Sequence, residues 1–387
     1  MKVVWPCPWF GDYRVPVFTN LNKLLDNNFY LFYSRTTVTE SVDRKMQANL
    51  PNNSEGLDEK IIIIGKQNKT TFANARLFIR YQPSLYKKLK QLNPDIVIAE
   101  AFGGWSIITI IYAIIHHKKI MMFYERTAYV ERHAPWWRTL YRRIIGKAVQ
   151  HFLINGNETR KYLDQLGFNK ILSTQGLMVA DTDGLAKDVI NFNKNERNLL
   201  KNSLTLDNGL IYLFVGQIVE RKGIKEMCSA WKEHLQYHPH DNLIIAGVGP
   251  LLDQYKENYK NILNMKFIGR VEYDNIYKYY AIADVFLMPT LEDNWCLVVP
   301  EAMACGLPIA CSIYNGGHNE LVKEGENGIN FDPLNRDNFL NALHYFHSVD
   351  LETFGEKSKT IISNFTPEIA AKKIFNACNL VQNKSNK

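Results

Sequence analysis

Residues 283–308 constrain the fold of this chain more than any other stretch. They begin with an apolar run, residues 283–288, which is typical of a buried parallel strand. An acidic loop with Glu292 and Asp293 follows, and then a short helix that Gly306 would end. Open α/β sheets bind ligands outside the carboxyl ends of their strands. This order of elements therefore predicts a parallel sheet with a ligand site in the acidic loop.

The same alternation of strands and helices recurs along the whole chain. In the second half, glycine-containing loops follow or flank apolar runs at residues 213–223, 243–250, 267–271, 315–322 and 325–328. In the first half, strands are expected at residues 2–5, 61–65, 95–99, 120–124 and 152–155, with an apolar helix at residues 104–115. Such alternation predicts α/β domains in which helices cover both faces of a parallel sheet. A length of 387 residues suits two of them.

Composition is consistent with two large cores and an uneven charge. Hydrophobic residues make up 46% of the chain, and the net charge is +7. Residues 1–180 carry 25 Lys and Arg against 13 Asp and Glu, whereas the remainder carries 21 against 26. The first half is therefore basic and the second mildly acidic. The six cysteines show neither a Cys-x-x-Cys motif nor metal-ligand spacing, so we expect reduced thiols.

We expect a cytoplasmic protein, bound at most peripherally to the inner face of the cell membrane. No signal peptide is expected, because the first residues lead straight into a strand. The longest apolar run, residues 105–115, is shorter than the roughly 20 residues needed to cross a bilayer.

The motifs in the second half resemble those of retaining glycosyltransferases of family 4, including bacterial enzymes of surface-polysaccharide synthesis. That family carries two acids separated by seven residues and then Ala-Met-Ala-x-Gly-x-Pro, which residues 293–308 match. The resemblance implies the GT-B architecture, in which two Rossmann-like domains face each other across a cleft. An acceptor-binding domain would span residues 1–180, with residues 365–387 packing back on it. A donor-binding domain would span residues 181–364.

By this resemblance, Asp293, Glu301 and Lys222 are the catalytic residues. Lys222 would bind the diphosphate, together with the helix N-terminus near Leu297, while Asp293 would hold sugar hydroxyls and Glu301 the ribose hydroxyls. The wider donor site implied is Gly216, Gln217, Arg221, Lys222, Gly247, Gly249, Arg270, Val271, Glu292, Asp293, Asn294, Trp295, Cys296, Leu297 and Glu301. The backbone near Arg270 would face the nucleobase.

Three positions depart from the family pattern. Gln217 stands where an arginine is usual, and Arg221 is the candidate to replace its charge. Asp293 stands where glutamate is usual, and Glu292 beside it could compensate. Cys296 stands where glycine is frequent, so its Cβ would have to point away from a phosphate close to the backbone.

On the acceptor side, the candidates are residues at loop positions of the first half: Gly11, Arg14, Glu125, Arg126 and His133. Glu125 and Arg126 come directly after an expected strand. His133 is better interpreted as an ordinary surface histidine.

No metal site and no cofactor are expected besides the nucleotide-sugar donor. Asp181-Thr182-Asp183 could in principle hold Mg²⁺, but it lies at the crossing between the two halves and is better interpreted as a linker turn.

Residues 132–148 predict an amphipathic helix with a one-sided basic face. Apolar side chains from Trp136 to Ala148 would fill one half of the helix, and Arg138, Arg142, Arg143 and Lys147 the other. This face is either solvated or turned toward an anionic membrane.

The favoured function is transfer of a sugar from a UDP- or GDP-linked donor to a glycan acceptor in cell-surface polysaccharide synthesis, and we expect this acceptor to be lipid-linked. One alternative is a nucleotide-sugar isomerase of the 2-epimerase type, although such enzymes usually lack the Glu-Ala-Met-Ala-x-Gly sequence. Another is a non-enzymatic binder of lipid or nucleic acid, suggested by the basic half. No nucleic-acid-binding motif is present, so nucleic acid is not expected as a partner.

Overall fold

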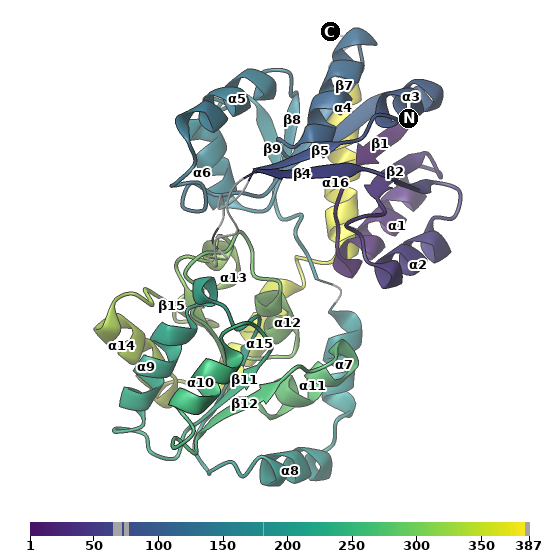
Figure 1. The fold of residues 1–387 in the computed structure, drawn as a ribbon. Coiled ribbons are helices and arrows are strands. Elements are labelled where there is room, and N and C mark those ends of the chain that lie inside the picture. Colours follow the sequence, from purple (N-terminus) through teal and green to yellow (C-terminus); the bar gives the residue numbers. More distant parts are fainter. Residues whose placement is uncertain (65–71, 73–76, 181, 384–387) are drawn as a thin grey trace. The chain divides into compact units, whose positions relative to one another are not determined.

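A computed structural model of the protein describes residues 1–64, 72, 77–180 and 182–383. The chain divides into two compact units. It leaves the first unit after Ala180 and returns to it at Phe365, and the second unit lies between these points (Figure 1).

The first unit is built around a parallel sheet of seven strands. These strands are β1 (Val3–Pro6), β2 (Phe29–Ser34), β3 (Ser54–Leu57), β6 (Ile96–Glu100), β7 (Lys119–Tyr124), β8 (His151–Ile154) and β9 (Leu172–Thr174). They lie in the order β3-β2-β1-β6-β7-β8-β9. Side chains such as Val4, Val97, Met122 and Phe152 are fully buried between the sheet and its helices. The parallel sheet expected for the first half is confirmed, and helices on its two faces explain why its strands are nearly all apolar.

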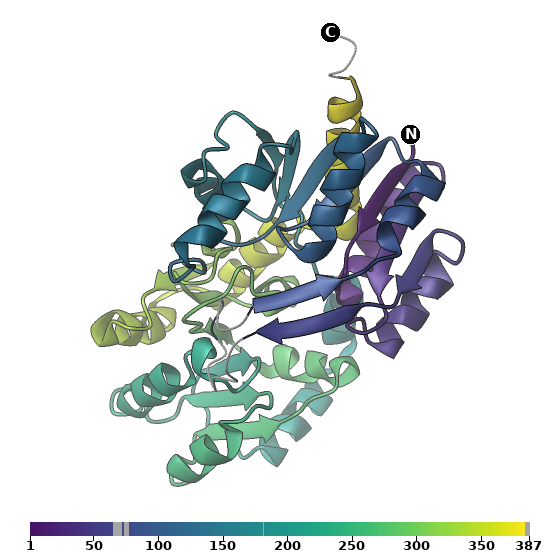
Figure 2. The ribbon, with the colours of Figure 1, turned by 45° about the horizontal axis from the view of Figure 1, so that its top comes forward.

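Eight helical segments accompany this sheet in the described part of the first unit. They are η1 (Asp12–Arg14), α1 (Val15–Leu24), α2 (Glu40–Asn49), α3 (Leu85–Leu92), α4 (Gly104–Ile115), α5 (Trp136–Gly146), α6 (Asn157–Gln165) and α16 (Pro367–Asn383). The last of these packs against α1 (Figure 2). Asn20 of α1 donates a hydrogen bond to Glu368 at 3.1 Å, and the Cys378 sulfur lies 3.8 Å from that of Met121. The expected return of the C-terminal helix to the first half is confirmed.

The strand expected at residues 61–65 does not belong to the parallel sheet. It is β4 (Lys60–Ile64), which pairs antiparallel with β5 (Leu77–Tyr81) in a separate two-stranded sheet. Gly65 lies outside the described residues. Ile62 and Ile63 are more than half exposed, whereas a central parallel strand would bury both. An apolar run alone does not distinguish these two placements, because it carries no information about the pairing partner.

Helix α5 is turned differently from the expectation. Trp136, Leu140 and Ile144 belong to the half of the helix predicted to be apolar, and their exposed fractions are 76%, 49% and 60%, so this half does not pack inward. Arg142 was expected in solvent, but it is buried. Periodicity was wrong here because Arg142 has a buried acidic partner, Glu131, that the helix sequence does not reveal.

The second unit contains a parallel sheet of six strands. They are β10 (Ile211–Val215), β11 (Asn242–Ala246), β12 (Met265–Gly269), β13 (Val285–Met288), β14 (Ile309–Ser312) and β15 (Gly328–Phe331). Their order is β12-β11-β10-β13-β14-β15. The helical segments are α7 (Asp183–Asn191), α8 (Lys194–Ser203), η2 (Glu220–Lys222), α9 (Ile224–His234), α10 (Leu252–Asn258), α11 (Tyr273–Ile282), α12 (Val298–Ala304), α13 (His318–Leu321), α14 (Arg336–Tyr345), η3 (Phe346–Ser348) and α15 (Leu351–Ile362). The strand order reverses at β10, because the chain moves outward to β11 and β12 and then returns to the other side with β13. Loops at such a reversal leave a crevice for ligands.

Two loops approach each other closely at this reversal. Gly223, which joins η2 to α9, has φ +69°. A Cβ added there would lie 2.0 Å from the carbonyl oxygen of Pro289, in the loop after β13. Only glycine satisfies both the backbone angle and the spacing, so this residue sets how near the two loops lie.

None of the helices in the described part of the chain has the length and apolar character needed to cross a bilayer.

We predict that Gly223→Ala destabilises the second unit by about 2 kcal/mol or more, because a left-handed backbone alone costs about 1–2 kcal/mol for alanine. Chemical denaturation followed by circular dichroism would measure the change. Gly184→Ala is the matched control, since an added Cβ there meets no atom within 4 Å. Equal stability of both variants would contradict the close approach of the two loops.

Candidate functional site

A buried lysine and an aspartate form the centre of the candidate site. Lys222 is the last residue of η2, and Asp293 lies in the loop after β13. The Lys222 ammonium donates a hydrogen bond to Asp293 Oδ2 at 2.7 Å and lies 3.2 Å from the Cys296 sulfur. Lys222 is 8% exposed. The three predicted donor-site residues therefore come together although 71 and 74 positions separate the aspartate and the cysteine from the lysine.

Arg221 also reaches this cluster. Its guanidinium lies 3.3 Å from Asp293 Oδ2 and 3.4 Å from the backbone oxygen of Glu292. The Arg221 carbonyl in turn accepts hydrogen bonds from the backbone amide of Leu291 at 2.8 Å and from the Thr290 hydroxyl at 3.1 Å. Two cations thus surround one carboxylate, and the loops after β10 and β13 are tied together at this point.

The charges of this cluster stabilise one another. Burial has the largest single effect on Asp293 and alone would raise its pKa. The charge and hydrogen bond of Lys222, the Arg221 charge and a hydrogen bond from Cys296 together outweigh burial and lower that pKa to about 2. Burial alone would lower the pKa of Lys222, but Asp293 raises it. Burial and the nearby Asp293 raise the pKa of the Cys296 thiol. At neutral pH the site therefore holds an ammonium, a carboxylate and an uncharged thiol.

The turn after β14 fixes the shape of the acidic loop. The Asp293 amide donates to the Tyr314 carbonyl at 3.2 Å, and the Gly316 amide donates to the Asp293 carbonyl at 3.0 Å. The side-chain oxygen of Asn315, which is fully buried, accepts from the Cys296 amide at 3.1 Å. Sequence reasoning matched this turn to the family but gave Asn315 no role. The asparagine before two glycines could have indicated this role, because asparagine side chains in turns often bind nearby backbone amides.

Glu301 lies in the first turn of α12, eight residues beyond Asp293. The Tyr280 hydroxyl donates a hydrogen bond to Glu301 Oε2 at 3.0 Å. Burial, and then the neighbouring Glu301 charge, raises the pKa of Tyr280 well above its usual value. Tyr280 therefore remains a donor that orients the carboxylate, a role that the sequence did not indicate.

The glycine loops bring neighbouring strand ends together. Gly216 donates its amide to the Ala246 carbonyl, and Gly247 donates to the Gly269 carbonyl at 2.8 Å. A Cβ on Gly247 would lie 1.8 Å from the Gly216 oxygen. The loops after β10 and β11 therefore lie too close together for any side chain at position 247.

The remaining predicted donor residues differ in exposure. Gln217 is exposed on the loop after β10. Arg270 is exposed and pairs with Glu272 at 2.7 Å. Glu292 is only 4% exposed. Gly249, Val271, Asn294 and Leu297 are half-buried, and Trp295 is buried.

In the first unit, Arg14 forms a second buried cluster. Its guanidinium donates to Glu100 Oε1 at 2.9 Å and lies 4.2 Å from the centre of the Phe123 ring. The indole of Trp5 donates to the other oxygen of Glu100 at 2.7 Å. Glu100 is the last residue of β6, at the carboxyl edge of the sheet. Sequence reasoning missed it, although an acid ending an apolar strand was visible.

Gly11 and Glu125 lie near this cluster. A Cβ on Gly11 would lie 2.7 Å from the Tyr13 ring, so the ring covers the glycine closely. Burial raises the pKa of Tyr13 to about 12, with Arg14 lowering it and Glu125 raising it. Glu125 therefore lies within electrostatic reach of Tyr13 and Arg14.

Arg126 and His133 are placed differently. Arg126 donates to one oxygen of Glu131 at 2.8 Å, and Arg142 donates to the other at 2.8 Å. Arg142 also donates to the Tyr162 hydroxyl at 2.7 Å. His133 is exposed. Arg126 thus belongs to a structural ion-pair network around Glu131.

The Asp-x-Asp sequence is only partly described. Asp181 lies outside the described residues, and Asp183 is the first residue of α7. Within the described part of the chain, Asp183 belongs to no group of three or more metal-ligating side chains with suitable spacing.

Comparison with known proteins shows what the second unit is similar to. Residues 196–364 match the family model of glycosyl transferases group 1. The chain is 28% identical to alpha-monoglucosyldiacylglycerol synthase of Acholeplasma laidlawii over 45% of its length and 44% of that protein. It is 32% identical to the Escherichia coli enzyme UDP-Gal:alpha-D-GlcNAc-diphosphoundecaprenol alpha-1,3-galactosyltransferase over 35% of its length and 36% of that enzyme. The aligned part thus spans less than half of these relatives.

The fold as a whole is also known. The structure of HepE from Anabaena in complex with UDP and glucose superimposes with a TM-score of 0.71 at 14% identity, covering 98% of this chain and 99% of that one. The predicted two-domain α/β architecture is confirmed at the level of fold.

We predict that Asp293→Asn lowers stability in a pH-dependent manner. The folded pKa of Asp293, about 2, lies below its ordinary value of 3.8. The ionised carboxylate therefore stabilises the fold fully above that ordinary value, and this stabilisation disappears as the pH falls toward 2. The difference in melting temperature between wild type and Asp293→Asn should be constant between pH 5 and 8 and shrink at pH 3. Asp253→Asn, on an exposed position of α10, is the control, and the same pH dependence in both variants would contradict the buried pair.

Proposed function

We infer, from the membership of residues 196–364 in the glycosyl transferases group 1 family, that this protein transfers a sugar from a nucleotide-sugar donor to a hydroxyl acceptor. The donor is UDP- or GDP-linked, and the transfer retains the anomeric configuration. The second unit binds the donor and the first unit binds the acceptor.

The buried Lys222 and the half-buried Arg221 beside Asp293 are the observation that carries this proposal. Arg221 and Lys222 meet one carboxylate at the carboxyl edge of a parallel sheet, so the three side chains hold one net positive charge. Transfer expels a nucleoside diphosphate, whose leaving oxygen gains negative charge as the bond to the sugar breaks. Preorganised cations stabilise such charge far better in a buried site than in water. Lys222 and Arg221 perform this task here without a divalent metal ion at the diphosphate.

The two acids have separate roles. Asp293, held by Lys222 and by the Trp295 amide at 3.1 Å, accepts hydrogen bonds from hydroxyls of the transferred sugar. Glu301, oriented by Tyr280, accepts hydrogen bonds from the ribose hydroxyls of the nucleotide. Both are carboxylates whose position is fixed before the substrate arrives, which reduces the entropic cost of binding.

The acceptor site lies around Arg14 and Glu100 in the first unit. Glu125 follows β7 and comes within electrostatic reach of both Tyr13 and Arg14. Acidic and basic side chains at the carboxyl edge of a parallel sheet suit a polar acceptor such as a glycan. The acceptor is a lipid-linked glycan of cell-surface polysaccharide synthesis.

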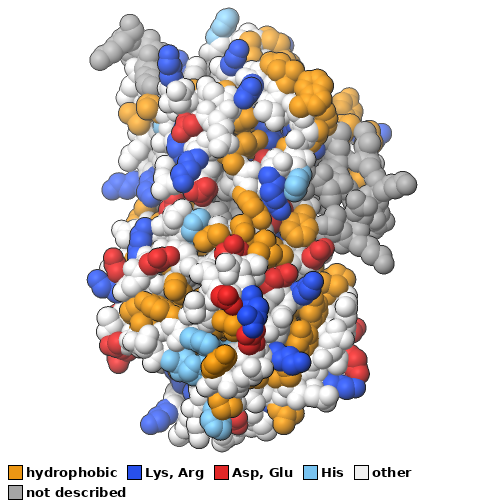
Figure 3. Space-filling view, turned by 90° about the vertical axis from the view of Figure 1, so that its left-hand side faces the viewer, with side chains coloured by type: hydrophobic (Ala, Val, Ile, Leu, Met, Phe, Trp, Pro, Cys, Tyr) orange, Lys and Arg blue, Asp and Glu red, His pale blue; other side chains and the backbone are white. Residues whose placement is uncertain are grey.

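Helix α5 supports a lipid-linked acceptor, for a reason that differs from the sequence-based one. Its exposed apolar residues Trp136, Leu140 and Ile144 lie on the same helix as the exposed Arg143, and the exposed Lys147 directly follows the helix. An exposed apolar stripe with basic neighbours is typical of helices that bind the surface of an anionic membrane. Hydrophobic side chains also gather on the molecular surface drawn in Figure 3. The first unit therefore contacts the membrane through α5, peripherally.

We predict that Lys222→Ala and Glu301→Ala each lower transfer at least about 100-fold, since removing one preorganised partner costs about 3 kcal/mol. The measurement is nucleotide release from a panel of UDP- and GDP-linked sugars in the presence of glycan acceptors. Lys225→Ala is the matched control, because Lys225 is exposed on the neighbouring helix α9. Near-normal turnover in a folded Lys222→Ala variant would contradict the proposed donor site. Conversion of the donor sugar without nucleotide release would instead indicate an isomerase.

We predict that the protein co-sediments with anionic vesicles at low salt and less at high salt, because each basic residue near the surface contributes about 1 kcal/mol. Trp136→Glu should lower binding at both salt concentrations, since it removes apolar contact. Leu199→Glu is the control, because Leu199 is 69% exposed on α8 in the other unit. Equal binding of all three proteins, or equal binding to neutral vesicles, would exclude α5 as the membrane contact.

A further inference from the structure

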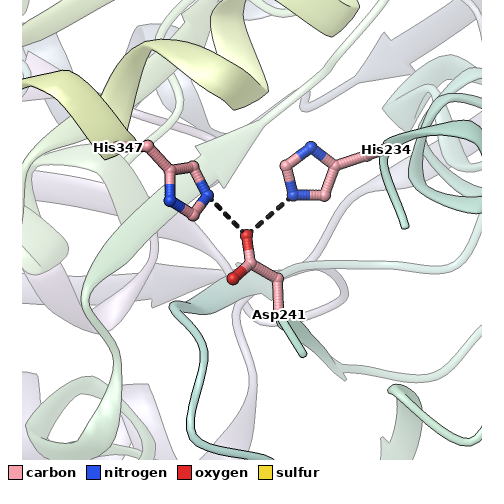
Figure 4. A group of neighbouring side chains, drawn as sticks. All are labelled: His234, Asp241 and His347. Carbon is pink, nitrogen blue, oxygen red and sulfur yellow. Dashed lines mark hydrogen bonds and ion pairs between the residues drawn. The ribbon is translucent and has the colours of Figure 1, made fainter. Parts of the chain in front are cut away.

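Two histidines converge on one buried aspartate in the second unit, away from the donor loops. His234 is the last residue of α9, Asp241 directly precedes β11, and His347 lies in η3. The Nε2 atoms of His234 and His347 each lie 2.8 Å from Oδ2 of Asp241 (Figure 4). The donor loops follow the carboxyl ends of the strands, whereas this group lies at the amino end of β11. It is therefore a separate site at the other edge of the sheet.

Two of the three side chains are buried, which distinguishes this group from a chance contact on the surface. His234 is fully buried, Asp241 is 2% exposed, and the His347 side chain is 28% exposed. The second oxygen of Asp241 accepts a hydrogen bond from the Leu210 amide at 2.9 Å, which fixes the plane of the carboxylate. Nδ1 of His234 is buried without a hydrogen-bond partner. The group thus has rigid, deeply placed ligand atoms and one side, at His347, that is open to solvent.

Two further histidines surround the group. The His238 ring stacks on that of His347 with centres 3.6 Å apart, and the His344 ring lies 5.1 Å from that of His234. Burial and the neighbouring imidazoles lower the pKa of both His238 and His344. Burial opposes ionisation of Asp241, but hydrogen bonds from His234 and His347 lower its pKa. Histidine side chains gather visibly on the surface of the molecule (Figure 3).

We propose that His234, Asp241 and His347 bind a divalent transition-metal ion, with Zn²⁺ as the preferred ion. Two imidazole nitrogens and one carboxylate oxygen, with a fourth position left for water, are ligands that zinc takes in proteins. Hard ions such as Mg²⁺ and Ca²⁺ prefer oxygen ligands alone. The three ligand atoms lie within 4.8 Å of one another. In a tetrahedral site with bonds of about 2.1 Å the ligand atoms would lie about 3.4 Å apart, so both nitrogens, now 2.8 Å from the Asp241 oxygen, would move slightly away from it on binding.

The ion would cross-link three parts of the second unit. Two of its ligands, at the end of α9 and just before β11, are seven residues apart, and the third, in η3 after α14, lies 106 residues beyond Asp241. Helix α9 begins directly after Lys222 and Gly223, so the ion would fix the end of the helix that is farther from the donor site. Because the unfolded chain does not bring the ligands together, binding raises the stability of the folded unit. The role is structural, so chelation should lower the melting temperature and leave transfer at moderate temperature intact.

Metal titration of the full-length chain tests the proposal. The chain, purified without a histidine tag and stripped with EDTA, is titrated with ZnCl₂ and with CoCl₂. We expect one tightly bound equivalent by elemental analysis, a visible Co²⁺ spectrum of a four-coordinate site, and a rise of several degrees in melting temperature. His347→Ala should weaken binding at least 100-fold, and Asp241→Asn should do the same.

Two controls keep the outcome unambiguous. His347 is partly exposed, so its replacement is the variant most compatible with folding, and His117→Ala, on an exposed position of the first unit, should leave binding unchanged. Absence of Zn²⁺ and Co²⁺ binding by the folded wild type, or equal binding by His347→Ala, would overturn the proposal and leave a hydrogen-bonded triad. The donor site is measured separately through Lys222→Ala, so failure of one proposal does not imply failure of the other.

Discussion

The buried contact between Lys222 and Asp293 is the interaction on which the candidate site depends. It joins the loops after β10 and β13, which a parallel sheet brings side by side. Neither charge would remain ionised alone in this environment, because burial disfavours both. The backbone supports the pair, since Gly223 allows the close approach to Pro289 and the Arg221 carbonyl accepts three hydrogen bonds from the second loop. Loop geometry and charge therefore depend on each other.

The three departures from the family pattern are accommodated by local geometry. Gln217 carries no charge where an arginine is usual. Arg221, four residues further along the chain, places its guanidinium beside Asp293 and so supplies a cation to the site. The shorter arm of Asp293 still meets Lys222 at 2.7 Å, so its missing methylene does not prevent the ion pair. The Cys296 thiol points to Lys222, and its amide is held by Asn315. A Cβ at this position is thus tolerated because its side chain has a buried partner.

The same physical reasoning links the two clusters outside the donor site. Glu131 binds Arg126 and Arg142 and so turns α5 with its apolar residues outward. Asp241 in the second unit accepts from two histidines in the same way. In both cases the hydrogen bonds to one buried carboxylate fix the orientation of its basic partners. These orientations leave apolar side chains of α5 exposed in the first unit and histidine side chains clustered near η3 in the second.

The sequence by itself determined the local elements and their order. Apolar runs and glycine turns sufficed to predict two α/β halves, and the resemblance of the loop motifs to a known family singled out Lys222, Asp293 and Glu301. Both kinds of signal lie within short stretches of chain. Only the tertiary structure decided which residues meet across long separations. The antiparallel pairing of β4 with β5, the buried Arg142 and the convergence of His234, Asp241 and His347 all depend on partners outside the element concerned. These partners lie between seven residues away, for His234 and Asp241, and 106 residues away, for Asp241 and His347. Periodicity and spacing carry no information about such partners, since side-chain contacts between distant segments are set by how the elements pack.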